Sequence, residues 1–163
     1  AGNDTNLNGG AGDDNVSGGA GTDTINVTAG EGSDTLTGGA GVDTFAFADG
    51  ASNATAAQTD TITDFTTGAS GDKIDFTITT AAVVEALSAA NTTAIAADTT
   101  LLAAATQAFT QLADDQITSF TFGGNNYVAI EIGGTAATYD AANDLLINMG
   151  STDLSGLVAA NFA

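Results

Sequence analysis

Large apolar residues recur in the first 50 residues at a fixed distance after an aspartate. Val16, Ile25, Leu36 and Phe45 each follow an Asp by two positions, with polar or small residues beside them. An apolar residue between polar neighbours is typical of a short strand that buries one face. The glycine-rich segments between these positions are turn signals. This part of the chain therefore predicts a stack of short strands and sharp turns around a narrow core.

The rest of the chain predicts longer strands with regular alternation of apolar and polar positions. A turn at 66–71 separates the first two of them, and the GGNN sequence at 123–126 joins the next two as a hairpin. The predicted strands span residues 60–65, 72–77, 117–122, 127–132 and 144–149. We therefore expect a mainly β protein.

Two helices are expected between these strands, at 81–89 and at 98–113, the second with Asp98 as its N-cap. An apolar stripe follows one face of the second helix and consists of Leu101, Leu102, Ala105, Phe109 and Leu112. Two interpretations of this stripe stay open. It packs against the neighbouring strands, or it forms a surface on which a partner docks.

The early turns form a repeat of nine residues. Residues 9–17 read GGAGDDNVS, residues 18–26 read GGAGTDTIN and residues 38–46 read GGAGVDTFA. The aspartates of five successive turns are Asp4, Asp14, Asp23, Asp34 and Asp43, and their spacings are ten, nine, eleven and nine residues. We expect the extra residues, near Asn6–Asn8 and at Val27–Thr28, to bulge a strand and to leave the turns intact.

The turns combine the two kinds of oxygen that a hard cation prefers. Glycine adopts backbone conformations that point carbonyl oxygens to one side, and the aspartate adds a carboxylate. Calcium takes six to eight such oxygens, and one turn supplies about half of them. The predicted metal ligands are Gly2, Asp4, Gly9, Gly10, Gly12, Asp14, Gly18, Gly19, Gly21, Asp23, Gly30, Gly32, Asp34, Gly38, Gly39, Gly41, Asp43 and Asp60.

Two repeats make one coil, so every second turn is expected to stack on the same edge at the strand spacing of about 4.8 Å. One edge would carry Asp4, Asp23 and Asp43, and the other Asp14 and Asp34. This pairing predicts about three or more calcium ions.

Three alternatives remain for these acidic turns. The segment is a flexible glycine- and aspartate-rich linker, although apolar residues in phase with Asp argue against that. Some sites have lost their metal, because the third turn carries Ala29 in place of its first glycine. Asp60 and Asp64 either cap the roll with a further ligand or are solvated carboxylates at a strand edge.

Charge and composition exclude several classes of function. Twenty acidic residues face one basic residue, Lys73, which gives a net charge of −19. Such a chain repels itself unless cations neutralise it, and it offers no basic patch for nucleic acid. Neither Cys nor His occurs, so thiolate sites and His-dependent catalysis are excluded. No scattered Glu has a partner base, and we expect no enzymatic activity within these residues.

Targeting signals are also absent from the sequence. No apolar run is long enough to span a membrane, and no N-terminal signal peptide is present. The chain starts in the middle of a repeat, which indicates a fragment of a larger protein.

The succession GGAGTDTI, GGAGVDTFAF, TDTITDF, GDKIDF and LSGLVAANF resembles the C-terminal region of RTX proteins exported by type I secretion. This resemblance implies a parallel β-roll of RTX nonapeptide repeats with a β-rich C-terminal cap that contains one or two helices. It also implies an uncleaved secretion signal at the C-terminus, and hence contact with the type I machinery. FTFGGNNYVAIEI and the Thr- and Ala-rich composition are similar to RTX surface-layer (S-layer) proteins.

The expected function is that of a calcium-dependent structural module of a protein at the surface of a Gram-negative bacterium. Residues 1–50 would form the roll and residues 51–163 a capping, secretion and assembly region. Folding and self-association into a lattice would follow calcium binding outside the cell. The alternative is the folding and secretion module of a larger secreted enzyme, a protease or lipase, or of an adhesin.

Overall fold

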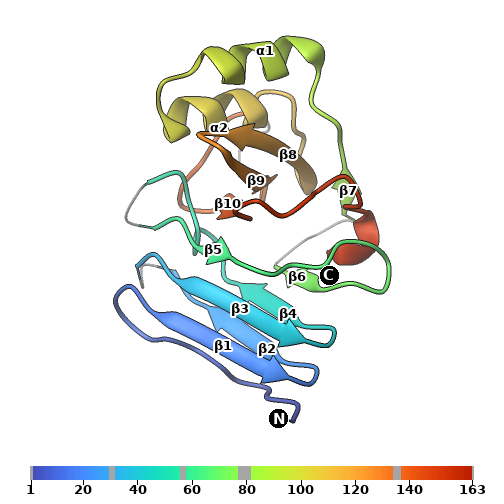
Figure 1. The fold of residues 1–163 in the computed structure, drawn as a ribbon. Helices are drawn as coiled ribbons and strands as arrows, with labels where there is room; N and C mark the ends of the chain where they lie inside the picture. The colour runs from blue at the N-terminus through green and yellow to red at the C-terminus, as the bar shows by residue number, and fades with distance from the viewer. Residues whose placement is uncertain (1, 30–31, 56–57, 77–81, 134–136, 163) are drawn as a thin grey trace.

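The computed structural model describes residues 2–29, 32–55, 58–76, 82–133 and 137–162. Short parallel strands at the N-terminal end form a β-roll, and a cap of strands and two helices lies on top of it (Figure 1). The fold is mainly β, as predicted. None of the described helices is long and apolar enough to cross a membrane.

The roll consists of two facing parallel sheets that the chain visits in turn. One face carries β1 (Asn15–Ala20), β3 (Thr35–Ala40) and β5 (Thr61–Ile62), and the other carries β2 (Thr24–Val27), β4 (Thr44–Phe47) and β6 (Lys73–Asp75). Ile25, Leu36 and Phe45 are buried between them, and Val16 is half-buried against the same cluster. The inward direction of these apolar residues is confirmed.

The predicted bulge at Val27–Thr28 is wrong. β2 and β4 pair without interruption from Thr24↔Thr44 to Val27↔Phe47. Both coils are extended by the same two residues, so the offset between them stays at 20 and the added position buries Val27 and Phe47. An insertion that both strands share lengthens the sheet instead of bulging it.

The insertion near Asn6 does alter the register of the first coil. The Asp4 N–H donates to Asp23 Oδ1, whereas Leu7 forms a bridge with Ile25. One residue more therefore lies between Asp4 and Leu7 than between Asp23 and Ile25, as expected for a bulge.

One sheet continues from the roll into the cap. β10 (Leu145–Asn148) pairs in parallel with β5 and antiparallel with β9 (Asn125–Ile130), which in turn pairs with β8 (Gln116–Phe122). β7 (Val83–Val84) adds a short parallel strand at the far edge. Gly123 and Gly124 form the β8–β9 turn with φ of 60° and 86°, a region that favours glycine. The division at residue 50 stays a prediction, and β5 and β6 continue the roll beyond it.

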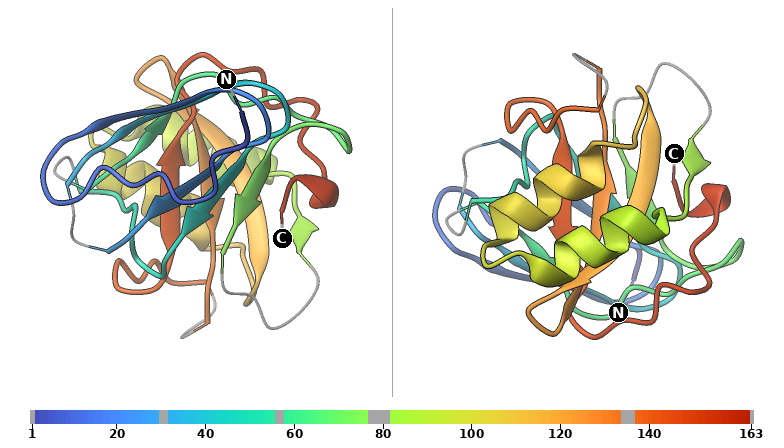
Figure 2. Two further views of the ribbon diagram at one scale, coloured as in Figure 1. Left: turned by 90° about the horizontal axis from the view of Figure 1, so that it is seen from below. Right: turned by 90° about the horizontal axis from the view of Figure 1, so that it is seen from above.

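The helices lie on the face of the cap sheet that is turned away from the roll (Figure 2). α1 is Ala89–Ala97, capped by Ser88, and α2 is Leu101–Phe109, capped by Thr100. The predicted helix at 81–89 is wrong, because β-branched Val83 and Val84 form β7 instead. Residues 77–81 lie outside the described residues. Asp98 ends α1 and does not begin α2.

Two apolar clusters fill the protein, one on each face of the shared sheet. The first joins the interior of the roll to Ile117, Ile130, Leu145 and Met149 of the cap. The second lies under the helices and includes Ala105, Phe109 and Leu112 of the predicted stripe. Leu102 is 51% exposed, so its assignment to the packed face is wrong.

The C-terminal segment closes the last coil of the roll. Phe162 forms a bridge with Ile74, and the 3₁₀ turn η1 (Ala159–Asn161) leads into it. The buried Asn161 amide donates to the carbonyls of Gly68 and Asp72 at 3.0 and 2.9 Å, and its oxygen accepts the Gly68 N–H at 3.0 Å. One side chain therefore satisfies three backbone groups of the loop before β6.

Candidate metal centre

The repeat aspartates form two columns, one on each edge of the roll. On the first edge each Asp N–H donates to the Oδ1 of the Asp one coil further on, from Asp4 to Asp23 (2.8 Å), Asp23 to Asp43 (2.8 Å) and Asp43 to Asp72 (2.9 Å). On the second edge Asp14 donates to Asp34 (3.0 Å) and Asp34 to Asp60 (2.8 Å). The structure thus stacks every second turn, as the sequence predicted.

The other carboxylate oxygen of three of these aspartates has no partner. Oδ2 of Asp14, Asp23 and Asp43 is buried without a hydrogen bond. Asp23 and Asp43 are each 1% exposed. An ionised oxygen taken out of water and left unpaired is costly, so these atoms call for a cation or a proton.

A glycine of the same turn lines the space beside each of these oxygens. A Cβ on Gly9 would lie 2.8 Å from Asp14 Oδ2, and a Cβ on Gly18 or Gly38 would lie 2.5 Å from the Oδ2 of Asp23 or Asp43. The Cβ position on Gly18 is also 2.7 Å from the Gly38 carbonyl oxygen. A carboxylate of one turn and a carbonyl of the next coil therefore face the same space.

The turns need glycine for a second reason, which is the close approach of the coils. Gly39 and Gly41 have φ of 102° and 145°, which disfavour any side chain. A Cβ on either would collide with the carbonyl oxygen of Gly19 or Gly21 in the adjacent coil. The repeat glycines therefore set the distance between half-sites as well as the turn.

These donors fit calcium. Calcium accepts carboxylate and carbonyl oxygens in a flexible set of six to eight. Among the residues that the structure describes, no three acidic side chains form a group that could hold a metal. Carbonyls of the glycine turns would therefore supply part of each donor set, and the residues that would hold the ion are the paired Gly and Asp positions of adjacent coils.

Burial and neighbouring acids act together on Asp43. Loss of hydration raises the pKa of its carboxyl above the usual value, and the charges of Asp72, Asp23 and Asp64 raise it further, against the hydrogen bond with Asp23. Each cause acts against the ionised form, and a bound cation would oppose them.

Most predicted ligands fall on the two edges. The first edge gathers Gly2, Asp4, Gly18, Gly19, Gly21, Asp23, Gly38, Gly39, Gly41 and Asp43. The second gathers Gly9, Gly10, Gly12, Asp14, Gly32, Asp34 and Asp60. Gly30 lies outside the described residues. Metal coordination by any of them stays a prediction.

Asp72 continues the first column but was missed by the sequence prediction. Its Oδ1 accepts the Asp43 N–H, and its Oδ2 accepts the Thr66 N–H at 2.7 Å. Asp72-Lys73-Ile74 keeps the spacing of Asp and apolar residue found in the repeat but lacks its glycines. That spacing alone is the signal that could have identified Asp72.

Asp64 ends the ladder of glycine turns. Its carboxylate accepts the N–H groups of Gly38 (3.0 Å) and Gly39 (2.8 Å). Backbone donors thus satisfy Asp64 and Asp72 at the end of the roll, whereas Asp14, Asp23 and Asp43 keep an open oxygen within it. The open oxygens mark where a cation is needed.

Comparison with solved structures gives distant similarities. The AlgE6R3 subunit of the Azotobacter vinelandii mannuronan C5-epimerase is 21% identical, with a TM-score of 0.43 over 99% of this chain and 78% of that one. The AlgE6R2 subunit of the same epimerase is 18% identical, with a TM-score of 0.34 over 98% of this chain and 91% of that one. A search of the curated proteins gave no match.

Comparison with protein families gives a match over most of the chain. The family described as peptidase M10 serralysin C terminal matches residues 4–147. It is a family of RTX-type, calcium-binding repeats in secreted proteins. Since the match includes both edges of the roll and the cap strands through β10, the chain belongs to the peptidase M10 serralysin C-terminal family.

Proposed function

We propose that this chain is a calcium-dependent structural module of a protein that is secreted and held at the surface of a Gram-negative bacterium. The observation that carries the proposal is the set of buried, unpartnered oxygens on Asp14, Asp23 and Asp43. The chain has one basic residue, so its own side chains cannot neutralise them. No catalytic role is proposed for these residues.

The roll folds only where calcium is plentiful. Aspartates of adjacent coils repel one another at short range, and a net charge of −19 favours an extended chain during export by the type I machinery. Extracellular calcium modules bind with Kd of roughly 10⁻⁴–10⁻³ M. A site at tenfold excess of calcium contributes about 1–2 kcal/mol. About three such sites are comparable with the whole stability of a small domain, about 5–15 kcal/mol.

Circular dichroism in EDTA and in millimolar calcium tests the folding switch. The expected result is a large gain of β signal on addition of calcium, cooperative because adjacent coils share half-sites. Magnesium at the same concentration is the control, since it requires a stricter octahedral geometry. Equal β content in EDTA and in calcium would overturn the proposal.

Assembly into a surface lattice is the finer part of the proposal. It is supported by the resemblance to RTX S-layer sequences and by a composition almost free of Lys, His and Cys. Electron microscopy of the chain in millimolar calcium is expected to show two-dimensional arrays or filaments. A strictly monomeric protein under these conditions would refute the lattice and leave the folding switch intact.

A second candidate is the folding and secretion module of a larger enzyme, with an adhesin as a further parent protein. The family match favours this candidate, because the family is named for the C-terminal part of a peptidase. Sequencing upstream of Ala1 distinguishes the two. A metalloprotease motif there would establish the enzyme reading, and further repeats without such a motif would favour the lattice.

A further inference from the structure

A second group of buried acids lies in the cap, outside the repeat. Glu131 follows β9 and Asp144 precedes β10, and the register Leu145↔Ile130 places the two opposite each other. Both are fully buried. Like charges directly opposite each other across two strands are destabilising, so this pair needs an explanation.

Neither oxygen of the Glu131 carboxylate has a hydrogen-bond partner. The Asp144 carboxylate is held in place from two sides, since Oδ1 accepts the Ile132 N–H at 3.0 Å and Oδ2 accepts the Asp140 N–H at 2.6 Å. Each carboxylate oxygen has a further lone pair, so Asp144 can still accept from a ligand. A positioned carboxylate and an open one thus face each other.

The surroundings add negative charge. Burial raises the pKa of Glu131 to about 7, and Asp144, Asp114 and Asp115 raise it in the same direction. Burial also raises the pKa of Asp144 to about 6, with further contributions from Asp140 and Asp114. The single basic side chain, Lys73, donates to the Ala160 carbonyl on the C-terminal segment. A cation from solution is the remaining means of neutralising the ionised pair.

We propose that Glu131 and Asp144 hold a divalent cation, calcium in the first instance, in a cap site independent of the roll. Their two carboxylates supply up to four oxygens, and backbone carbonyls and water complete the six to eight that calcium takes. Asp114 and Asp140 are exposed beside the pair and give a cation an electrostatic route to it. The bound ion fixes the ends of β9 and β10 against each other.

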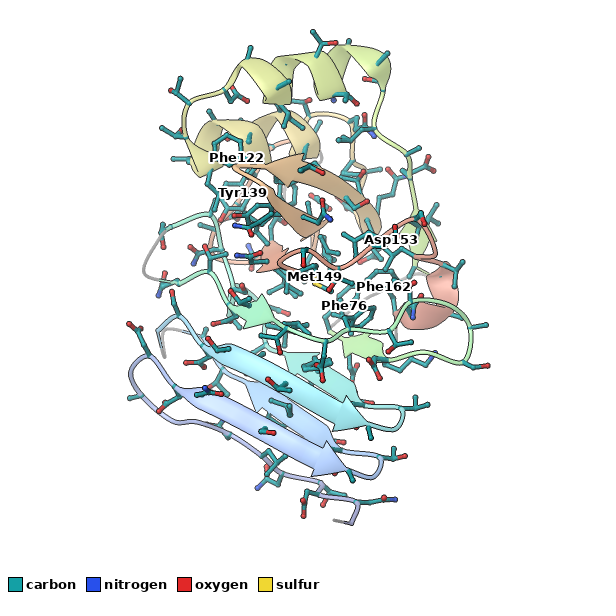
Figure 3. The ribbon with its side chains drawn as sticks, viewed as in Figure 1. Phe76, Phe122, Tyr139, Met149, Asp153 and Phe162 are labelled. Carbon is teal, nitrogen blue, oxygen red and sulfur yellow. The ribbon has the colours of Figure 1, made fainter. Side chains whose placement is uncertain are left out.

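A tyrosine beside the pair makes the site measurable. The charges of Asp144 and Asp140 raise the pKa of Tyr139, after the larger effect of burial. Figure 3 shows Tyr139 between α2 and the strands of the cap. Residues 1–50 contain no Tyr, and the chain contains no Trp. Emission from bound Tb³⁺, a substitute for Ca²⁺, excited through tyrosine therefore reports on the cap.

The first experiment compares the full chain with Glu131→Gln and Asp23→Asn. For Glu131→Gln we expect one Ca²⁺ fewer in equilibrium dialysis and a loss of about tenfold or more in Tyr-sensitised Tb³⁺ emission. Asp23→Asn is expected to lower calcium binding by the roll but to keep that emission. Failure of roll binding would leave the calcium count of Asp23→Asn unchanged, so the two proposals fail separately.

The opposite outcome identifies a protonated acid. If Glu131→Gln binds as many ions as the native chain and keeps its emission, Glu131 is a buried neutral carboxylic acid and the cap site is refuted. Should Glu131→Gln fail to fold, Tyr139→Phe decides the question, with Tyr127→Phe as control. A full calcium count with lost emission in Tyr139→Phe supports the site, and unchanged emission overturns it.

Discussion

The roll and the cap share one sheet but are stabilised in different ways. In the cap, Phe109 is packed against Tyr139 with ring centroids 5.0 Å apart, and the helices bury a continuous apolar cluster. In the roll, one narrow row of apolar residues lies between two columns of aspartates. The comparison teaches that the cap can fold by burying apolar surface, whereas the roll needs its charges neutralised first.

The largest expected effect comes from removing the main apolar side chain of the cap. Phe109→Ala leaves a cavity beneath α2, where Phe109 is fully buried, and should cost about 3–5 kcal/mol of unfolding free energy. Because no ion is involved, thermal or urea unfolding should give a similar loss at low and at saturating calcium. A loss that appears only with calcium would contradict the division between the two regions.

Gly18→Ala attacks the roll without touching the cap. The new methyl group would lie 2.5 Å from Asp23 Oδ2 and 2.7 Å from the Gly38 carbonyl oxygen, in the space proposed for calcium. We expect a loss of about 2–3 kcal/mol in millimolar calcium, measured by urea unfolding. Gly2→Ala is the matched control, since no atom lies within 4 Å of its Cβ position. Equal behaviour of the two variants would argue against the site.

Acidification should stabilise the calcium-free protein. Burial and the neighbouring charges raise the pKa of Glu131 to about 7 from a model value of 4.5, so the folded state binds the proton more tightly than the unfolded state does. Its destabilising effect is full above pH 7 and is lost as pH falls towards 4.5. In EDTA the unfolding free energy should rise by about 1–2 kcal/mol between pH 8 and pH 5.

The matched variant for this pH effect is Glu131→Gln. Its uncharged amide cannot titrate, so its pH profile in EDTA should be flatter than that of the native chain. If both chains give the same profile, the rise belongs to other carboxyls of the protein.

The smallest effect is expected at the junction of the C-terminal segment and the roll. Asn161→Ala removes the side chain that bonds the backbone of Gly68 and Asp72 and should cost about 1 kcal/mol. Hydrogen exchange should speed up at Lys73 and Ile74 and remain unchanged under α2. Unchanged exchange at β6 would show that the segment does not support the last coil.

The sequence predicted the elements whose residues repeat or alternate. The Asp and apolar positions of the nonapeptides located both edges of the roll, and the GGNN turn located the hairpin between β8 and β9. These features are local, because turn chemistry and side-chain alternation are properties of neighbouring residues.

The errors concern contacts between distant segments. Val83 and Val84 became a strand because β8 lies beside them, and Asp72 joined the first column because β6 pairs with β4. The Glu131–Asp144 pair is created by antiparallel register over 13 residues of chain. No local pattern announces such a pair, since each acid alone resembles a solvated one.

Hydrogen exchange with and without calcium tests the central claim most directly, because it reports on both regions of one molecule. The amides of β2 and β4, such as Ile25 and Phe45, should be protected in millimolar calcium and exchange within seconds in EDTA. The amides of α2 and of the β8–β9 hairpin should keep most of their protection in both. Protection of the roll that is equal in EDTA and in calcium would contradict the account.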